Sequence, residues 1–155
     1  MPLRKPLRLS HFDYATPGAY FVTVCTQDRA CLFGEVRDGA VHLSESGGIV
    51  EQVWRNLPAH FPNFGIDEFV VMPNHVHGVL LIEKEGGRPL PNLMRAFKAF
   101  STREIKARGI VRDAIWQRGY YEHVVRGEDD LAAIRRYIQD NPVKWDLDDE
   151  NPARR

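Results

Sequence analysis

The sequence predicts an α+β sandwich, in which helices pack on one mainly antiparallel sheet. Residues 18–26, 66–72 and 75–83 are rich in β-branched and aromatic residues, which is typical of strands. Segments 45–57 and 92–107 repeat apolar residues at helical spacing. Short connections interleave the two kinds of segment, and this arrangement favours the α+β class.

The region before residue 60 is predicted to add a hairpin and a capped helix. An Asp-Gly pair at 38–39 signals a tight turn between short strands over 31–36 and 40–43. Ser44 is a suitable N-cap for the helix over 45–57, whose apolar residues share one face.

The second half is predicted to continue with a strand pair and a last helix. Pro-Asn at 73–74 makes a short break between two strands, as in a hairpin or a bulged pair. Residues 115–126 suit a loop and a short strand. Residues 127–141 suit a helix, because the acids near its start face the positive end of the helix dipole. The acidic tail, 146–155, is expected to be loose.

Size and composition predict one soluble domain spanning residues 1–155. Hydrophobic residues make up 43% and charged residues 27%, which argues against disorder. No apolar run approaches the ~18 residues of a membrane span. The N-terminus has charge but no apolar core, so it does not resemble a secretory signal. Cys25 and Cys31 lack a zinc spacing and are expected to be buried free thiols. A cytoplasmic protein without membrane contact is therefore expected.

Charge is balanced overall and uneven along the chain. Lys plus Arg equals Asp plus Glu at 21 each, and the pI is about 7.0, which argues weakly against nucleic-acid binding. Residues 88–126, however, carry nine basic side chains against three acidic ones, and 127–150 carry eight acidic against three basic. Residues 1–18 form a predicted basic arm. This asymmetry allows a basic face for phosphates, and a solvated helix surface remains the alternative.

The stretch that carries the chemistry is Pro73-Asn74-His75-Val76-His77. Strand side chains alternate between faces, so His75 and His77 point the same way and Val76 points the other way. Two imidazoles on one face of a rigid strand can hold a divalent metal. They can equally be hydrogen-bonded structural residues.

Tyr137 and Asn141 are four apart in the last predicted helix, so they lie one turn from each other on one side. Tyr137 is either a core residue with its hydroxyl at the rim or a side chain that projects over the sheet toward the histidines. Asn141 would then add an oxygen ligand. Two nitrogens and one oxygen favour Mn²⁺ or Zn²⁺ over Mg²⁺, and phosphate oxygens from a substrate shift the preference toward harder ions.

Together these segments resemble the single-tyrosine transposases, whose HUH motif is His, a bulky apolar residue and His. The similarity is greatest to the REP-associated tyrosine transposases and their insertion-sequence relatives, and it covers nearly the whole chain. Its parts are the opening segments 8–14 and 18–26, the HUH strand 67–77, the segment 116–123 and the helix 137–144.

The resemblance implies a ferredoxin-like HUH sandwich and a DNA-nicking mechanism. His75 and His77 would hold Mg²⁺ or Mn²⁺, with Asn141 as the third ligand. Tyr137 would attack the scissile phosphate of single-stranded DNA, leaving a 5′-phosphotyrosine and a free 3′-hydroxyl, and the reverse attack would rejoin strands. The implied target is an imperfect palindromic hairpin with a short single-stranded guide sequence, bound by a monomer or a homodimer.

Further candidates surround this set. Tyr120 and Tyr121 are rival nucleophiles, aromatic core residues or base-stacking residues. His123 is an accessory group that orients a phosphate or the tyrosine, or a residue that simply packs. The candidate DNA-binding residues are Arg4, Lys5, Arg8, Arg95, Lys98, Arg103, Lys106, Arg118 and Arg126. The alternatives are a non-catalytic hairpin-binding relative, a metal-dependent hydrolase with no nucleic-acid role, and a structural domain with core histidines.

Overall fold

A computed structural model of the chain describes residues 18–83, 87–110 and 113–154. The basic arm, except Gly18, lies outside the described residues, and so do Arg4, Lys5 and Arg8.

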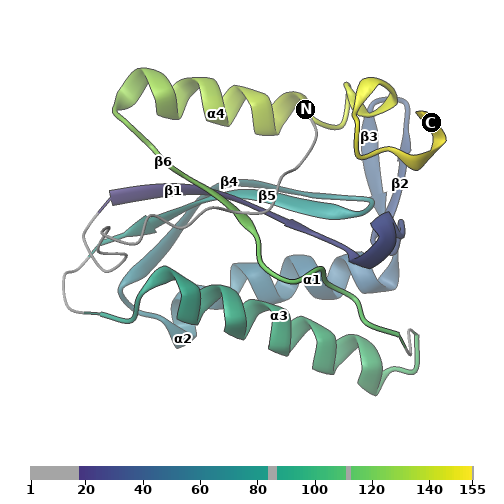
Figure 1. The fold of residues 1–155 in the computed structure, drawn as a ribbon, viewed down its shortest axis with the longest axis horizontal. Coiled ribbons are helices and arrows are strands. Elements are labelled where there is room, and N and C mark those ends of the chain that lie inside the picture. Colours follow the sequence, from purple (N-terminus) through teal and green to yellow (C-terminus); the bar gives the residue numbers. More distant parts are fainter. Residues whose placement is uncertain (1–17, 84–86, 111–112, 155) are drawn as a thin grey trace.

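A four-stranded antiparallel sheet forms the centre of the molecule, in the order β4-β5-β1-β6 (Figure 1). Its strands are β1 (Gly18–Cys25), β4 (Phe64–Met72), β5 (His75–Ile82) and β6 (Tyr121–Val124). The turn at 73–74 joins β4 to β5 as the predicted hairpin, and a register shift between Ile66 and Phe69 interrupts the pairing.

Helices cover both faces of this sheet. Helix α4 (Glu128–Asp140) lies on one face, whereas α1 (Glu45–Arg55), α2 (Leu57–His60) and α3 (Leu90–Ala107) lie on the other (Figure 1). A separate hairpin, β2 (Gly34–Arg37) and β3 (Ala40–Leu43), contains the predicted Asp-Gly turn. Three short 3₁₀ turns complete the described elements, at Gln27–Arg29, Trp145–Leu147 and Pro152–Arg154. The predicted α+β class is confirmed.

The start of α1 shows how local sequence positions a helix here. The Ser44 hydroxyl accepts a hydrogen bond from the Gly47 amide at 3.1 Å, as predicted for an N-cap. Gly47 is required because a Cβ there would lie 2.0 Å from the Phe33 carbonyl oxygen. The first turn of α1 therefore sits directly against the chain that precedes β2.

Strand alternation divides the core into two layers. One face of β1 and β5 contributes Val22, Val24, Val76 and Leu80 to the layer beneath α1 and α3. The opposite face contributes a smaller cluster under α4, made of Phe21, Val79, Ile134 and Ile138. His75 and His77 share the odd-numbered, α4-facing side of β5 with Val79.

The expectation of a loose tail after Trp145 is wrong for the described residues up to 154. Trp145 is 8% exposed, Glu150 4% and Asn151 6%. The Arg29 guanidinium donates to the Asp149 carbonyl at 3.1 Å and lies 3.5 Å from the Glu150 carboxylate. Buried aromatic surface and this ion pair order a segment whose acidic composition suggested no structure.

Two smaller expectations have mixed outcomes. Cys25 is buried as predicted, but Cys31 is exposed, and both thiols are free. Among the residues that the structure describes, no helix is both long enough and apolar enough to cross a bilayer.

Candidate active site

The two histidines of β5 lie side by side under α4. Their ring centroids are 4.5 Å apart, His75 is fully buried, and His77 is 3% exposed. The prediction that both point to one face is confirmed by the close approach of their rings.

Helix α4 brings the two other predicted residues to this face. The Tyr137 ring centroid lies 5.3 Å from that of His77 and 6.1 Å from that of Phe21. Asn141, directly after the helix, is buried, and its Nδ2 donates to the Tyr137 carbonyl at 2.9 Å. Tyr137 remains 41% exposed. A side chain that packs on His77 and still reaches solvent can be approached by a large substrate.

Polar contacts fix α4 over the sheet. Arg135 makes a bidentate ion pair with Asp67 of β4, at 2.8 and 2.7 Å. At the start of the helix, the Asp130 carboxylate accepts from the Arg126 amide at 2.8 Å and lies 2.9 Å from His123 Nε2. The position of Tyr137 is therefore set by contacts at the start of its helix and two residues before Tyr137 itself.

Burial determines the charge state of the histidine pair. It lowers the pKa of His75 to about 4, against the opposing influence of the Asp148 carboxylate. The pKa of His77 lies well below its usual range, first because of burial and then because of His75. Both imidazoles are neutral at neutral pH, which is the form that binds metals.

Tyr137 is held in its protonated form. Its pKa is raised by burial, and the nearby Asn141 side chain partly opposes the shift. The phenol therefore needs a cation close to its oxygen, or a proton acceptor, to become a nucleophile.

The atoms around the pair fit a divalent cation. His75 Nε2 and Asn141 Oδ1 are both buried and have no hydrogen-bond partner among the described residues. A buried acceptor without a partner is costly, and a cation would satisfy it. In the described part of the chain, no group of three His, Cys, Asp or Glu side chains is placed to hold a metal ion. The available metal ligands are thus imidazole nitrogens and an amide oxygen, a set suited to Mn²⁺. Phosphate oxygens from a substrate would shift the preference toward harder ions.

Five of the predicted DNA-binding residues gather around one hollow of about 570 Å³, between α3 and the segment 114–118. These residues are Arg95, Lys98, Arg103, Lys106 and Arg118. The Lys98 ammonium donates to the carbonyls of Gln117 at 2.8 Å and Gly119 at 2.5 Å, so it also holds this wall in place.

The hollow is connected to the histidine site through β1. Backbone hydrogen bonds join the Gln27 amide to the Ile115 carbonyl and the Gln117 amide to the Cys25 carbonyl, at 2.8 and 2.9 Å. Cys25 pairs with His75 in the sheet. The backbone thus links the two places, but α3 lies on the face of the sheet opposite to α4, toward which His75 points.

The other predicted site residues lie in different parts of the structure, and their positions distinguish their roles. Arg126 precedes α4 and does not line the hollow. Tyr120 is buried in the layer beneath α1 and α3, away from the histidines, which argues against it as a nucleophile. Tyr121 lies on the α4 side, with its ring 6.3 Å from that of Phe21. His123 contacts Asp130 and so belongs to the support of α4.

Sequence reasoning missed the neighbours of His77 on β1. Thr23 Oγ1 lies 2.8 Å from His77 Nδ1, and the Phe21 ring stacks on the His77 ring at 5.6 Å. Strand alternation predicts that Phe21 and Thr23 share a face. Their pairing with β5 depends on the strand order, which no local pattern contains.

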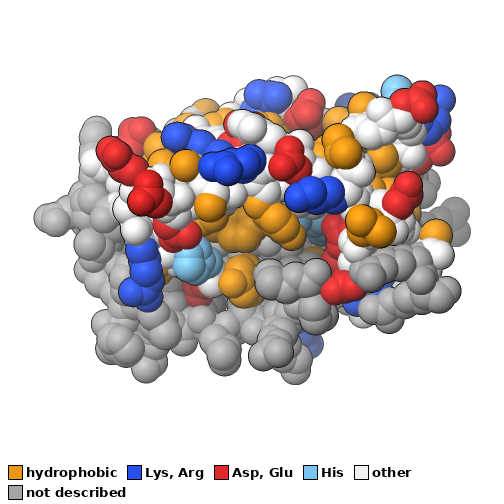
Figure 2. Space-filling view, turned by 90° about the horizontal axis from the view of Figure 1, so that it is seen from above, with side chains coloured by type: hydrophobic (Ala, Val, Ile, Leu, Met, Phe, Trp, Pro, Cys, Tyr) orange, Lys and Arg blue, Asp and Glu red, His pale blue; other side chains and the backbone are white. Residues whose placement is uncertain are grey.

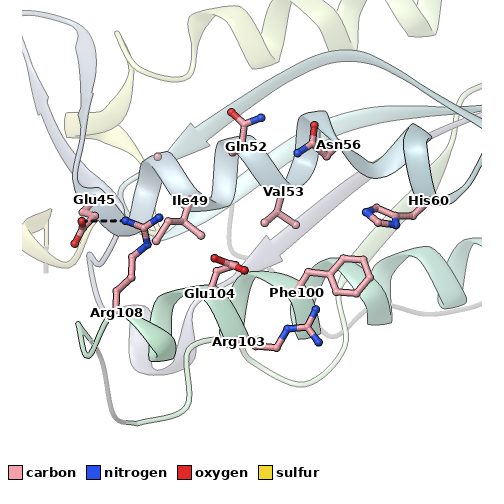
Figure 3. Close-up of a pocket in the computed structure, with 11 residues that line it drawn as sticks. Glu45, Ile49, Gln52, Val53, Asn56, His60, Phe100, Arg103, Glu104 and Arg108 are labelled. Carbon is pink, nitrogen blue, oxygen red and sulfur yellow. Dashed lines mark ion pairs between the residues drawn. The ribbon is translucent and has the colours of Figure 1, made fainter.

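A second hollow, of about 520 Å³, lies between α1 and α3 on the far side of the sheet from α4 (Figure 3). The Phe100 ring lines its His60 end, against His60 at 5.1 Å and the Arg103 guanidinium at 5.5 Å. An ion pair of Glu45 with Arg108, at 3.5 Å, borders it. Its mixed charge gives no preference for phosphate.

The face that carries α4 also has mixed charge. Figure 2 shows basic and acidic side chains interspersed over an apolar band on this side. Among the described residues, a cluster of cations lies beside α3.

A sequence model of the family described as "Transposase IS200 like" matches residues 19–141. The chain belongs to the IS200-like transposase family. The chain is 38% identical over 165 residues to an uncharacterized protein of Haemophilus influenzae, across 94% of this chain and 91% of that one. It is 26% identical over 147 residues to a second Haemophilus influenzae protein, provisionally named a REP-associated tyrosine transposase, across 85% and 74% of the two chains.

Solved structures agree with this family. A REP-associated tyrosine transposase bound to a REP hairpin superposes with a TM-score of 0.67 at 25% identity, covering 90% of this chain and 74% of that one. A protein of Deinococcus radiodurans, provisionally named a transposase, gives a TM-score of 0.56 at 18% identity over 86% and 95% of the chains, and supports the fold alone. The resemblance to the REP-associated transposases is confirmed.

Proposed function

We propose that this transposase nicks and rejoins single-stranded DNA at the foot of a hairpin, with Tyr137 as the nucleophile. The observation that carries the proposal is the position of Tyr137, half open to solvent and with its ring 5.3 Å from His77. His75 Nε2 and Asn141 Oδ1, both buried without partners, support a metal site at the same place.

His75, His77 and Asn141 would hold the ion, and we propose Mg²⁺ or Mn²⁺, because phosphate oxygens would complete its ligands. The bound ion would act as a Lewis acid on the scissile phosphate. The Tyr137 hydroxyl loses its proton to solvent and forms a bond from Oη to phosphorus. The bond from phosphorus to O3′ breaks, and the departing O3′ takes up a proton, leaving a 5′-phosphotyrosine and a 3′-hydroxyl. Attack by a 3′-hydroxyl on the phosphotyrosine reverses these steps and joins strands.

Hairpin DNA is proposed as the substrate on two grounds. The structurally similar transposase was solved bound to a REP hairpin. In this chain, a hollow lined by Arg95, Lys106 and Arg118 among others can accept a phosphate backbone. One chain supplies Tyr137, both histidines and Asn141, so we expect a monomer to be sufficient for nicking.

The test uses hairpin oligonucleotides from the host's own repeats, each with a single-stranded flank. One set is labelled at the 5′ end and one at the 3′ end, and both are incubated with protein and Mg²⁺ or Mn²⁺. Denaturing gels are expected to show the 3′-side fragment linked to protein. The link is expected to disappear in Tyr137→Phe and with chelator, and hairpin affinity is expected to remain.

The matched control is Tyr121→Phe, on the same face of the sheet, which is expected to keep the adduct. If the adduct persists in Tyr137→Phe and disappears in Tyr121→Phe, the nucleophile is Tyr121 and not Tyr137. Tight hairpin binding without any adduct, in both metals and several hairpins, would instead support a non-catalytic hairpin-binding protein.

A further inference from the structure

We infer that Asn74 is a positioning residue that selects the tautomer of His75, with the ring proton on Nδ1 and the free electron pair of Nε2 toward Asn141. The consequence for metal binding rests on the proposed function, but the tautomer itself does not.

The first step is the orientation of the Asn74 amide, which is 1% exposed. One end of the amide lies 2.7 Å from the Glu150 carbonyl oxygen and 3.2 Å from the Arg29 carbonyl oxygen. Carbonyl oxygens can only accept hydrogen bonds, so this end must be the NH₂ group. The other end is therefore the oxygen.

The second step follows from that oxygen. Asn74 Oδ1 lies 2.8 Å from His75 Nδ1. An amide oxygen accepts and cannot donate, so Nδ1 must carry hydrogen. A neutral imidazole has one N–H. Nε2 is left with an electron pair.

The third step concerns the atoms opposite. The Asn141 amide is oriented in the same way, because its NH₂ group donates to the Tyr137 carbonyl at 2.9 Å. Its Oδ1 and His75 Nε2 are thus two buried acceptors, and neither has a partner among the described residues. Asn74 acts through the His75 ring, which leaves Nε2 as one acceptor for a cation, and Asn141 supplies Oδ1 as the other. The opposite tautomer of His75 would place a hydrogen where the ligand electron pair is needed.

His77 provides an internal contrast. Its Nδ1 meets the Thr23 hydroxyl at 2.8 Å, and a hydroxyl can either donate or accept. Thr23 therefore does not select a tautomer by itself. We therefore expect a single tautomer for His75, whereas this contact is compatible with either tautomer of His77.

The contacts that orient Asn74 come from segments far apart in the sequence. Arg29 lies in a turn in which Asp28 and Arg29 both have positive φ, at 56° and 58°. Glu150 belongs to the C-terminal segment, and its carboxylate lies 3.5 Å from the Arg29 guanidinium. This pair of segments supplies both carbonyls, so the end of the chain contributes to the geometry of His75.

The direct test is the nitrogen spectrum of the metal-free protein labelled with ¹⁵N-histidine, at a pH where the rings are neutral. Long-range ¹H–¹⁵N correlations identify which ring nitrogen carries hydrogen. We expect His75 to show Nδ1–H alone. A His75 signal with Nε2–H, or an even mixture of the two forms, in the wild-type protein would overturn the inference without any variant.

Variants then link the tautomer to the metal. In Asn74→Ala, His75 is expected to gain the Nε2–H form, and Mn²⁺ affinity by calorimetry to fall about 10–100-fold. Asn74→Asp retains an acceptor for Nδ1–H, so it is expected to keep the tautomer and recover part of the affinity. Unchanged tautomer and affinity in Asn74→Ala would refute the assignment. If Asn74→Ala does not fold, the wild-type spectrum still tests the tautomer of His75, and Asn74→Asp still tests its effect on Mn²⁺ affinity.

The matched control is Asn63→Ala. Asn63 is also a buried asparagine that donates to a backbone carbonyl, that of Arg88. It lies just before Phe64, which pairs with Ile82 at the end of β5 remote from His75. Its loss is expected to leave the His75 signals and Mn²⁺ affinity unchanged. The tautomer measurement and the adduct assay are independent. If His75 carries its proton on Nδ1 but no adduct forms, the tautomer assignment stands and only the proposed function is refuted.

Discussion

Gly78, directly after His77 in β5, provides a quantitative test of the packing beneath the site. A Cβ at this position would lie 2.3 Å from Trp54 Cζ2, 3.0 Å from Trp54 Cη2 and 3.1 Å from Phe69 Cβ. Trp54 is fully buried, with its ring 5.2 Å from that of Phe97 and 5.9 Å from that of Phe69. The indole is enclosed on both sides and cannot swing away, so Gly78→Ala must displace Trp54 or the backbone of β5.

Overpacking of this kind costs about 1–3 kcal/mol of unfolding free energy. For a domain of 155 residues, this corresponds to a Tm about 2–12 °C lower. Because His77 lies next in the strand and faces the other layer, a shift of β5 is also expected to weaken Mn²⁺ binding.

The assay is urea unfolding and calorimetry of Gly78→Ala, Trp54→Phe and the double variant. The smaller phenylalanine ring frees space for the new methyl group, so the double variant is expected to be more stable than the sum of the single effects, by at least about 0.5 kcal/mol. The control is Gly48→Ala in α1, where a Cβ meets nothing within 4 Å, and it is expected to stabilise by about 0.5–1 kcal/mol. A Gly78→Ala protein as stable as wild type, or strictly additive effects in the cycle, would refute this reasoning.

Three further predictions concern the site and its surroundings. First, the metal-free protein is expected to lose stability as pH falls from about 6.5 toward 4, by about 1.4 kcal/mol per pH unit for each buried histidine, because the unfolded chain binds protons that the folded imidazoles do not. Urea unfolding between these pH values tests this, and stability that does not change with pH contradicts it. Second, replacing Arg95 and Lys106 by alanine is expected to remove about two phosphate contacts. The slope of log binding constant against log salt concentration should then fall by about 2, and adduct formation at saturating protein should be retained. Anisotropy titrations across salt concentrations measure the slope, and an unchanged slope excludes this surface. Third, Asp67→Asn removes the carboxylate charge that pairs with Arg135, so single-turnover nicking is expected to slow while hairpin affinity is kept. Equal nicking rates would show that other contacts suffice to position α4.

Much of this protein follows from local sequence. Strand alternation is sufficient to put His75 and His77 on one face, since that period is a property of any strand. Helical spacing is likewise sufficient to bring Tyr137 and Asn141 together, and the Ser44 cap was predictable because its partner lies three residues away.

Only the tertiary structure decided how these local units meet. Tyr137 reaches His77 because α4 packs on β4 and β5, held by an ion pair between residues 67 and 135. The acidic tail, which was expected to be loose, is ordered by Arg29 and by the Asn74 amide, 76 residues from Glu150. Local periodicity carries no information about such pairs, because burial and hydrogen bonding between distant segments depend on strand order and helix placement. For the same reason the sequence alone could name the two histidines but could not reveal which atoms orient them.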